Sequence, residues 1–555
     1  MGQPSFQASN ALIYVTYGLF LYGYLHMFSV PSCYTGHEPV PHLEDALTTW
    51  MYSIIGTGIA WRMRNQSKGE FLAALPLALN FIASAMGSGI LFSYPELATI
   101  SGVQGVVTYA LASSLPLFVF ATLGPIIRRK CPEGFVLTEW TRQRYGLIAS
   151  LYLSFMTLVT LFLYMVSELS AIGQVVSALT GLKGLPVMIV QCVVTTIYTS
   201  LGGFKISFIT DNLQGALVLG LIVIATICVG VETKIDRSLI ESSGLTKANL
   251  LGWQLLYILP VAILTNDFFL SSFWLRTFAS KTDRDLRIGI SIAFVAILII
   301  LTLVGCAGLV SAWAGTWPGP DNAAGSVAFF LLLEQLPSWV VGIVLVMTVT
   351  LSTAAFDSLQ SAMVTSASND LFRNRLNIWF IRGGVVLIII PVIVLALKAP
   401  SILQIFLISD LVSAATIPAL IVGLSDRFYF WRGFEVVVGG LGGILCVFIF
   451  GTVYYGDALK GAQLILLEQG LYQNDWSAFG AFVAAPFGGL LSGCLALAFR
   501  VGFTWARARL TGRRFDAFDR PADYLARQAS DDDEVIVEPT EHMEPGIAKK
   551  HGKFF

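Results

Sequence analysis

Charged residues are scarce in this sequence of 555 residues, at 12 % of the total, whereas soluble proteins carry about 25 %. Hydrophobic residues make up 55 %, so most of the chain needs an apolar environment and a water-soluble globular protein is excluded. The net charge is −1, so the chain lacks the positive field that collects nucleic acid. We therefore expect a lipid bilayer as a partner and no nucleic acid.

Histidine and cysteine are also few. The seven cysteines stand mostly singly in apolar runs, which is unlike a disulfide framework. Among the five histidines, His37 and His42 lie near Cys33 in one predicted outer loop, but a fourth ligand is missing and we interpret the group as incidental rather than as a metal site. No predicted span carries an HExxH, GxSxG or paired Cys–His motif. The sequence thus argues against an enzyme, and we expect no cofactor.

Long apolar runs predict transmembrane helices, because a bilayer core of about 30 Å needs about 20 apolar residues per helix. We predict an all-α polytopic protein with about fourteen spans, at residues 11–31, 46–61, 71–100, 105–126, 147–180, 185–201, 207–230, 253–275, 288–313, 339–368, 378–397, 402–425, 434–455 and 477–500. The shorter run at 326–337 predicts an amphipathic helix on the membrane face. Residues 11–31 are either a retained helix, which we favour, or a signal sequence.

Lysine and arginine collect in every second predicted loop, for example at 62–68 and 276–287, whereas loops such as 314–325 carry almost none. Basic loops face the cytosol by the positive-inside rule. Both termini are then cytosolic, in a multi-pass protein that we assign to the plasma membrane. The last residues, 504–555, begin basic and become acidic, which predicts a disordered cytosolic tail.

Two predicted spans contain residues that interrupt helices. Span 71–100 has Gly87, Ser88 and Gly89 near its middle, and span 253–275 has Pro260 followed by Thr265, Asn266 and Asp267. Glycine and proline at such places favour local unwinding. Unwound segments free backbone groups that can bind a solute, so we expect a substrate site at Gly87, Ser88, Gly89, Thr265, Asn266 and Asp267.

The two interrupted spans lie five apart, and each opens a block of five. Broken helices at matching places in two halves indicate an inverted-repeat transporter with its site near mid-membrane. The predicted organisation is N-terminal helices at 1–70, a first repeat at 71–230, a second repeat at 253–425, two additional helices at 434–503 and the tail at 504–555.

Six carboxylates lie at or within apolar runs: Glu96, Glu168, Asp211, Asp267, Asp357 and Asp410. Each costs roughly 2.5–3.5 kcal/mol on insertion scales and needs a partner or a wet cavity. Asp357 stands among serines and threonines, on a helix face that must point inward. For Asp211 and Asp267, capping a helix or pairing with Arg276 is an equally good interpretation as a role in transport.

Residues 202–214 read GGFKISFITDNLQ and resemble the sodium/solute symporter signature GG-L-x-A-V-x-x-T-D-x-x-Q. Three other elements agree in order: the broken helix at 81–89, Asp267 with Trp274-Leu275-Arg276, and the run from Ser358 to Phe372. The likeness covers about residues 65–425. It implies a LeuT-type fold with a 5+5 inverted repeat, and secondary active transport in which an ion gradient drives a small polar solute uphill.

The resemblance also implies ligands for a coupling ion. The backbone carbonyls of Ala83 and Met86 correspond to ligands in the family, but its hydroxyl pair falls here at Ala354 and Ala355, which cannot coordinate a cation. The candidates to replace that pair are Ser352, Thr353 and Asp357, and we include Asp211 in the ion-coupling set. Alternatively, Asp357 binds a proton in place of the ion. We expect H⁺ or Na⁺ as the coupling ion and favour H⁺.

Among the branches of the family, the approach to the signature and the Trp274-Leu275-Arg276 element look most like urea/polyamine symporters. Ala85 and Ile90 stand where sugar-transporting relatives present polar residues, which disfavours a sugar. We predict import of a small nitrogenous solute such as urea. The alternatives are another small solute (a polyamine, an amino acid or a monocarboxylate) and a solute sensor of the same fold that has lost transport.

Overall fold

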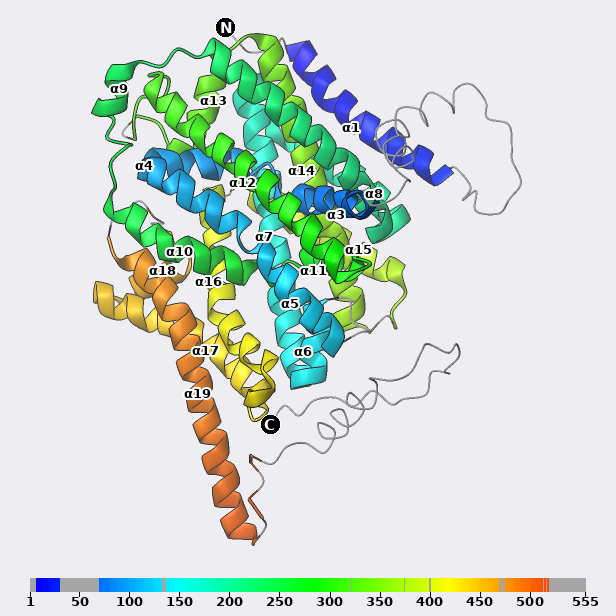
Figure 1. Ribbon diagram of the computed structural model, residues 1–555, viewed down its shortest axis with the longest axis vertical. Coiled ribbons are helices and arrows are strands. Elements are labelled where there is room, and N and C mark those ends of the chain that lie inside the picture. Colours follow the sequence, from blue (N-terminus) through cyan, green and yellow to red (C-terminus); the bar gives the residue numbers. More distant parts are fainter. Residues whose placement is uncertain are drawn as a thin grey trace.

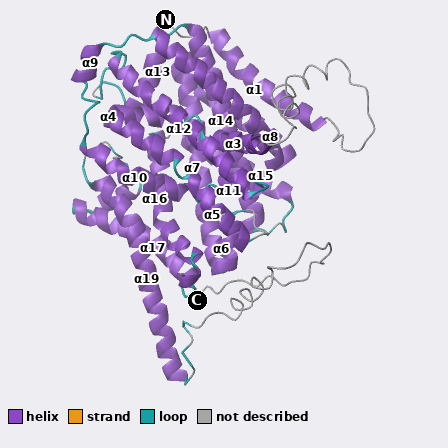
Figure 2. Ribbon diagram, viewed as in Figure 1, coloured by secondary structure: helices purple, strands orange, loops and turns teal. Residues whose placement is uncertain are grey.

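The computed structural model describes residues 6–29, 69–131, 136–320, 322–373, 375–398, 401–468, 471, 475–512, 514–515 and 517–518. All regular structure within these residues is helical, as the apolar runs predicted (Figure 2). Ten helices of the described part are long and apolar enough to cross a membrane. The predicted span 46–61 lies outside the described residues, as do Cys33, His37 and His42, so the count of fourteen spans is not confirmed.

The first broken helix unwinds where the sequence predicted. Helix α3 (Gly69–Ala85) ends before Gly87, and α4 (Ile90–Ser114) begins after Gly89. The chain continues through α5 (Leu117–Lys130), α6 (Leu137–Tyr145), α7 (Leu147–Thr180) and α8 (Gly184–Glu232). Backbone groups freed inside a membrane need other partners, so the segment between α3 and α4 must be satisfied by side chains of neighbouring helices.

The second broken helix is also confirmed. Helix α10 (Leu250–Asp267) stops directly after the predicted Asp267, and α11 (Ser271–Ala279) follows, whereas Pro260 stays inside α10. The indole Nε1 of Trp274 donates a hydrogen bond of 3.0 Å to the carbonyl of Phe268, which satisfies a backbone group that the break sets free.

Helix α9 (Arg237–Ser242) lies between α8 and α10 in the chain. The remaining helices of the second half are α12 (Asp283–Trp313), α13 (Ala328–Leu333), α14 (Ser338–Ser366), α15 (Ile378–Ala396) and α16 (Ile402–Ile421). A short π-helix at Ala367–Leu371 continues α14. Short 3₁₀ helices form at Gly325–Val327, Val422–Leu424 and Asp426–Phe428. The run predicted as an amphipathic helix at 326–337 forms only the short α13. Its Phe329 and Phe330 are buried, so this helix packs into the bundle.

Several helix boundaries differ from the predicted spans. The loop expected between 185–201 and 207–230 is helical, so α8 is continuous. The span at 105–126 is interrupted at Leu115–Pro116, because proline has no amide hydrogen to continue the helical bonding. Helix α19 (Ser477–Thr511) runs past the predicted end at 500, so helix occupies the first residues assigned to the tail. Residues from 519 onward lie outside the described part.

Helix α4 runs through the boundary predicted between spans 71–100 and 105–126, and it is kinked there at Gly102. Its backbone is kinked at φ 63° and ψ −152°, yet helix continues on both sides. A Cβ at this position would lie 2.0 Å from the carbonyl oxygen of Leu245, and the Val103 amide donates to that same oxygen at 2.9 Å. The close approach of the two backbones therefore requires glycine.

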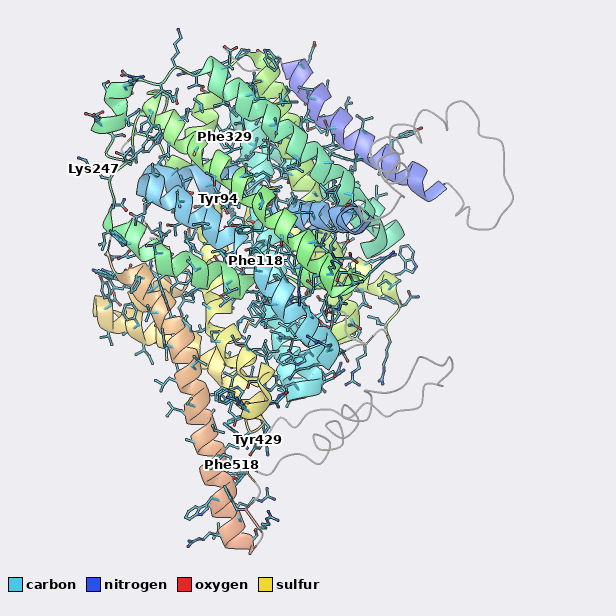
Figure 3. The ribbon with its side chains drawn as sticks, in the orientation of Figure 1. Tyr94, Phe118, Lys247, Phe329, Tyr429 and Phe518 are labelled. Atoms are coloured by element: carbon cyan, nitrogen blue, oxygen red, sulfur yellow. The ribbon has the colours of Figure 1, made fainter. Side chains whose placement is uncertain are left out.

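Helices outside the two predicted repeats lie at the edges of the bundle. Helix α1 (Phe6–Ser29) lies along α8 and α14, and α17 (Gly433–Tyr455), α18 (Ala458–Ile465) and α19 pack together and against α16. The far end of α19 projects from the bundle as a long rod (Figure 1). Beside its base, the Tyr429 hydroxyl donates to the Phe518 carbonyl at 3.0 Å (Figure 3).

A buried ion pair joins α17 to α19. The Arg500 Nε lies 2.6 Å from Glu435 Oε1, and both side chains are inaccessible to solvent. Arg500 also donates to the Phe430 carbonyl at 2.7 Å, and Glu435 Oε2 accepts from the Arg432 amide at 2.9 Å. The buried Arg500 Nη1 has no hydrogen-bond partner among the described residues, and removal of either member of the pair would leave an uncompensated buried charge.

We predict that Arg500→Met destabilises the protein by about 3–5 kcal/mol, the usual effect of breaking a buried pair. The measurement is the midpoint of thermal unfolding in detergent. Arg507→Met, at an exposed position of the same helix, is the matched control and should change stability by less than about 0.5 kcal/mol. Adding Glu435→Gln to Arg500→Met should recover part of the loss; equal midpoints for Arg500→Met and the control would contradict the interpretation.

Candidate functional site

A cavity of about 120 Å³ lies between the two broken helices. Residues of α3, α4, α5, α7, α10, α11, α14 and α16 line it, together with Gly87 and Leu270 from the two breaks. The lining includes Tyr94, which Figure 3 labels on α4 in the interior of the bundle. Both breaks thus open onto one shared cavity, which is the arrangement expected of a solute site.

Glu168 of α7 closes the first break from the side. Its Oε2 accepts hydrogen bonds from the Ser88 amide (2.9 Å) and the Ser88 hydroxyl (2.8 Å), and its Oε1 lies 3.5 Å from the Gly89 amide. Helix α4 begins at these amides without a cap from its own side chains. A carboxylate is favourable at the N-terminus of a helix, where unpaired amides and the helix dipole carry positive charge. Glu168 therefore caps the half-helix α4.

Asp267 and Asp410 meet at the second break. Asp267 ends α10, Asp410 lies on α16, both line the cavity, and their charges repel each other. Asn266 connects the region: its amide nitrogen donates to the Tyr164 hydroxyl, its oxygen accepts from Ser409 at 3.2 Å, and its side chain lies beside Asp410. Two neighbouring buried carboxylates cannot both stay ionised without a positive partner.

The cavity wall is aromatic as well as acidic. Tyr94 and Tyr109 stack with ring centroids 3.9 Å apart and an interplanar angle of 4°. Tyr164 and Phe406 form a second pair with centroids 5.0 Å apart. Aromatic faces attract cations and cover methylene groups. Among the described residues that line the cavity, three are carboxylates and none is lysine, arginine or histidine.

A buried arginine, Arg276, contacts two residues of the cavity lining but is paired with an aspartate outside the lining. Arg276 of α11 lies 2.5 Å from Asp211 of α8, and both side chains are buried. Arg276 also donates to the Ser358 hydroxyl at 3.1 Å and to the Ser272 carbonyl at 2.8 Å, both residues of the cavity lining. Because Asp211 compensates its charge, Arg276 does not neutralise the acidic cavity.

Two of the six predicted substrate residues line this cavity. Gly87 and Asp267 line it. Ser88 donates a hydrogen bond to the lining residue Glu168, and Asn266 lies beside the lining residue Asp410. Gly89 packs against the ring of Phe406, and the Thr265 hydroxyl bonds within its own helix and with Ser413.

The predicted ion-coupling residues do not line the cavity. Ala83 and Met86 are buried beside the first break, and Asp211 pairs with Arg276. The Ser352 hydroxyl is bonded to the Gln191 amide at 2.8 Å, and the Thr353 hydroxyl to the Val349 carbonyl at 2.6 Å. Asp357 is fully buried, with the Ser361 hydroxyl 3.5 Å from its Oδ1.

Several cavity residues were not assigned from the sequence. Glu168 and Asp410 stood out only as carboxylates in apolar runs, and the tyrosines Tyr94, Tyr109 and Tyr164 carried no signal. Helical spacing cannot show that residues from α4, α7 and α16 converge, because their meeting depends on tertiary packing. A usable signal for the carboxylates was the scarcity of nearby lysine or arginine in the same spans.

The sequence profile described as the Sodium:solute symporter family matches residues 68–425. The spermidine transporter DUR31 of Candida albicans is 48 % identical over 94 % of this chain and 95 % of its own length. The chain belongs to the sodium:solute symporter family. Other family relatives match shorter stretches: a probable urea active transporter of Schizosaccharomyces pombe is 26 % identical over 30 % of this chain and 26 % of its own length. The predicted kinship with the urea/polyamine branch is confirmed.

Solved structures show the same fold. A Na⁺-coupled sialic acid symporter in a substrate-bound outward-open state superposes with a TM-score of 0.62 at 14 % identity, covering 89 % of this chain and 97 % of that one. A nucleobase-cation-symport-1 family transporter in a closed conformation gives 0.53 at 13 % identity, covering 78 % and 93 %. This symporter therefore has the predicted LeuT-type fold.

Gly87 offers a direct test of the first break. A Cβ at this position would lie 1.8 Å from Glu168 Oε1, so we predict that Gly87→Ala displaces the carboxylate. Overpacking costs about 1–3 kcal/mol, which predicts a roughly 5- to 150-fold weaker solute affinity. Gly383→Ala on α15, where no atom lies within 4 Å of the added carbon, is the control. Uptake kinetics at matched expression decide the question, and equal half-saturation concentrations for the two variants would refute the prediction.

Proposed function

We propose that this symporter imports linear polyamines of the spermidine class across the plasma membrane, driven by a proton gradient. The observation that carries the proposal is the composition of the cavity: three carboxylates and two pairs of aromatic rings, with no basic residue among the described lining. A negatively charged, partly desolvated cavity stabilises a cation and disfavours an anion. Sialic acid, a sugar or a monocarboxylate has no positive charge to offer.

A polyamine matches both components of the wall. Its ammonium groups can pair with carboxylates in charge-assisted hydrogen bonds, and its methylene segments can lie against aromatic faces. Urea is neutral and would leave three buried carboxylates without a positive partner. The relative that aligns along nearly the whole chain carries the name of a spermidine transporter, whereas those named for urea align over 30 % of the chain or less. Urea as the substrate is not confirmed, and the charge of the cavity favours a polyamine.

The proton as coupling ion is supported by the hydroxyls of α14. Ala354 and Ala355 offer no side-chain ligand, and the hydroxyls of Ser352 and Thr353 are engaged by Gln191 and by the α14 backbone. Two of these four residues therefore have no side-chain oxygen for a sodium ion, and the other two hold their hydroxyls in hydrogen bonds to the protein. Asp357 on the same helix is a carboxylate that can take up and release a proton, and we assign the coupling role to it.

Uptake into proteoliposomes tests substrate and driving force together. We predict that radiolabelled spermidine accumulates above its equilibrium ratio when the outside is acidic, and that a sodium gradient alone gives no accumulation. Urea should neither accumulate nor compete with spermidine. Accumulation of urea that excess spermidine leaves unchanged would overturn the polyamine assignment, and saturable binding without any uptake would favour the alternative of a solute sensor.

Asp357→Asn tests the coupling role. We predict that this variant still equilibrates spermidine across the vesicle membrane but loses proton-driven accumulation, because the amide cannot carry a proton. Asp457→Asn is the matched control, since Asp457 is exposed and caps α18 through the Leu459 amide, a role that asparagine also fills. Accumulation by Asp357→Asn at the level of the control would remove Asp357 from coupling.

A further inference from the structure

The carboxylates of the cavity fall into two groups, one at each helix break. Glu168 lies at the break between α3 and α4, and the pair Asp267 and Asp410 lies at the break after α10. Tyr164 lines the cavity together with both groups. It precedes Glu168 by four residues of α7, about 6 Å along the axis, and its hydroxyl contacts Asn266 beside the second group.

Glu168 has acceptor capacity left for a ligand. Its Oε2 is occupied by two donors from Ser88, but Oε1 has only the long contact of 3.5 Å from the Gly89 amide. An ionised carboxylate has about four acceptor positions. Oε1 is also the atom that lies closest to the Cβ position of Gly87, and both residues line the cavity. A donor in the cavity can therefore reach it.

The aspartate pair should bind a cation more strongly than Glu168 does. Asp267 and Asp410 repel each other across the cavity wall, and no basic residue is present in the described lining to separate their charges. A bound cation relieves this repulsion. A single ammonium group should then prefer the aspartate pair, and Glu168 should matter only to a solute that has a second positive charge.

A polyamine carries its positive charges on separate nitrogen atoms, so it can present one ammonium group to each of the two groups of carboxylates. Four methylenes in an extended chain separate the terminal nitrogen atoms by roughly 6 Å, from standard bond lengths and angles. The ring of Tyr164, paired with Phe406, provides a surface for the methylenes between the two charges.

We infer that the cavity binds its substrate at two poles: the aspartate pair binds one ammonium group, and Glu168 binds a second. Glu168 is then the residue that selects diamines and longer polyamines over monoamines. The inference rests on the proposed polyamine transport and adds a rule for which amines are accepted. A solute that fills both poles ties the break in α3–α4 to the break in α10–α11, whereas a monoamine leaves the first break unoccupied.

The test is inhibition of radiolabelled spermidine uptake by two amines of equal carbon number, 1,4-diaminobutane and n-butylamine. In the unmodified protein the diamine should inhibit at least about tenfold more strongly, since hydrogen bonds to charged groups change affinity by roughly 10- to 150-fold. Glu168→Gln should weaken inhibition by the diamine about tenfold or more and leave that by butylamine within about threefold. Asp410→Asn should weaken both. Glu334→Gln, at an exposed position, is the matched control.

The unmodified protein alone already decides between the two proposals. Spermidine uptake that butylamine inhibits as strongly as the diamine would overturn the two-pole inference and leave polyamine transport intact. Absence of spermidine uptake would overturn the proposed function and the inference with it. For Glu168→Gln, equal weakening of both amines would assign Glu168 a purely structural role as the cap of α4, which also contradicts the inference.

Discussion

Buried negative charge is the constraint on which the structure of the site depends. Glu168, Asp267 and Asp410 converge on one cavity whose described lining contains no basic side chain. Such charges are unfavourable in a low-dielectric interior unless hydrogen bonds or cations compensate them. The protein compensates Glu168 in part, through the amides and hydroxyl at the start of α4. The Asn266 side chain lies beside Asp410, and the remaining imbalance is the basis of the proposed affinity for cations.

The two breaks and the carboxylates explain each other. Unwinding at Gly87–Gly89 exposes amides that a carboxylate from α7 can cap, and the absence of a Cβ at Gly87 leaves the space that Glu168 Oε1 occupies. At the other break, α10 ends at Asp267, so the last residue of the half-helix carries its charge into the cavity. Two buried charges outside the cavity are matched by ion pairs: Arg276 with Asp211, and Arg500 with Glu435. The three carboxylates of the cavity have no basic partner in its described lining.

The sequence predicted the fold further than it predicted the site. The glycines of 87–89 located the first break and the polar run ending at Asp267 located the second, because unwinding has a local signal in the chain, whereas Pro260 stays inside α10. The family resemblance added the LeuT-type topology. The continuity of α8, the break at Pro116 and the kink at Gly102 were missed, although only the kink depends on a contact distant in sequence, with the Leu245 carbonyl. Glu168 and Asp410 were visible as buried carboxylates, but their convergence with Tyr94, Tyr109 and Tyr164 follows only from packing of helices distant in sequence.

The most direct measurement is a cryo-electron microscopy structure of the protein in lipid nanodiscs with bound spermidine. The account predicts elongated density in the cavity, passing Tyr164, with one ammonium nitrogen about 3 Å from Glu168 Oε1 and another at the same distance from Asp267 or Asp410, as charge-assisted hydrogen bonds require. Spermidine density at a different place, or a continuous helix through residues 86–89 that leaves Glu168 without its Ser88 partners, would contradict it.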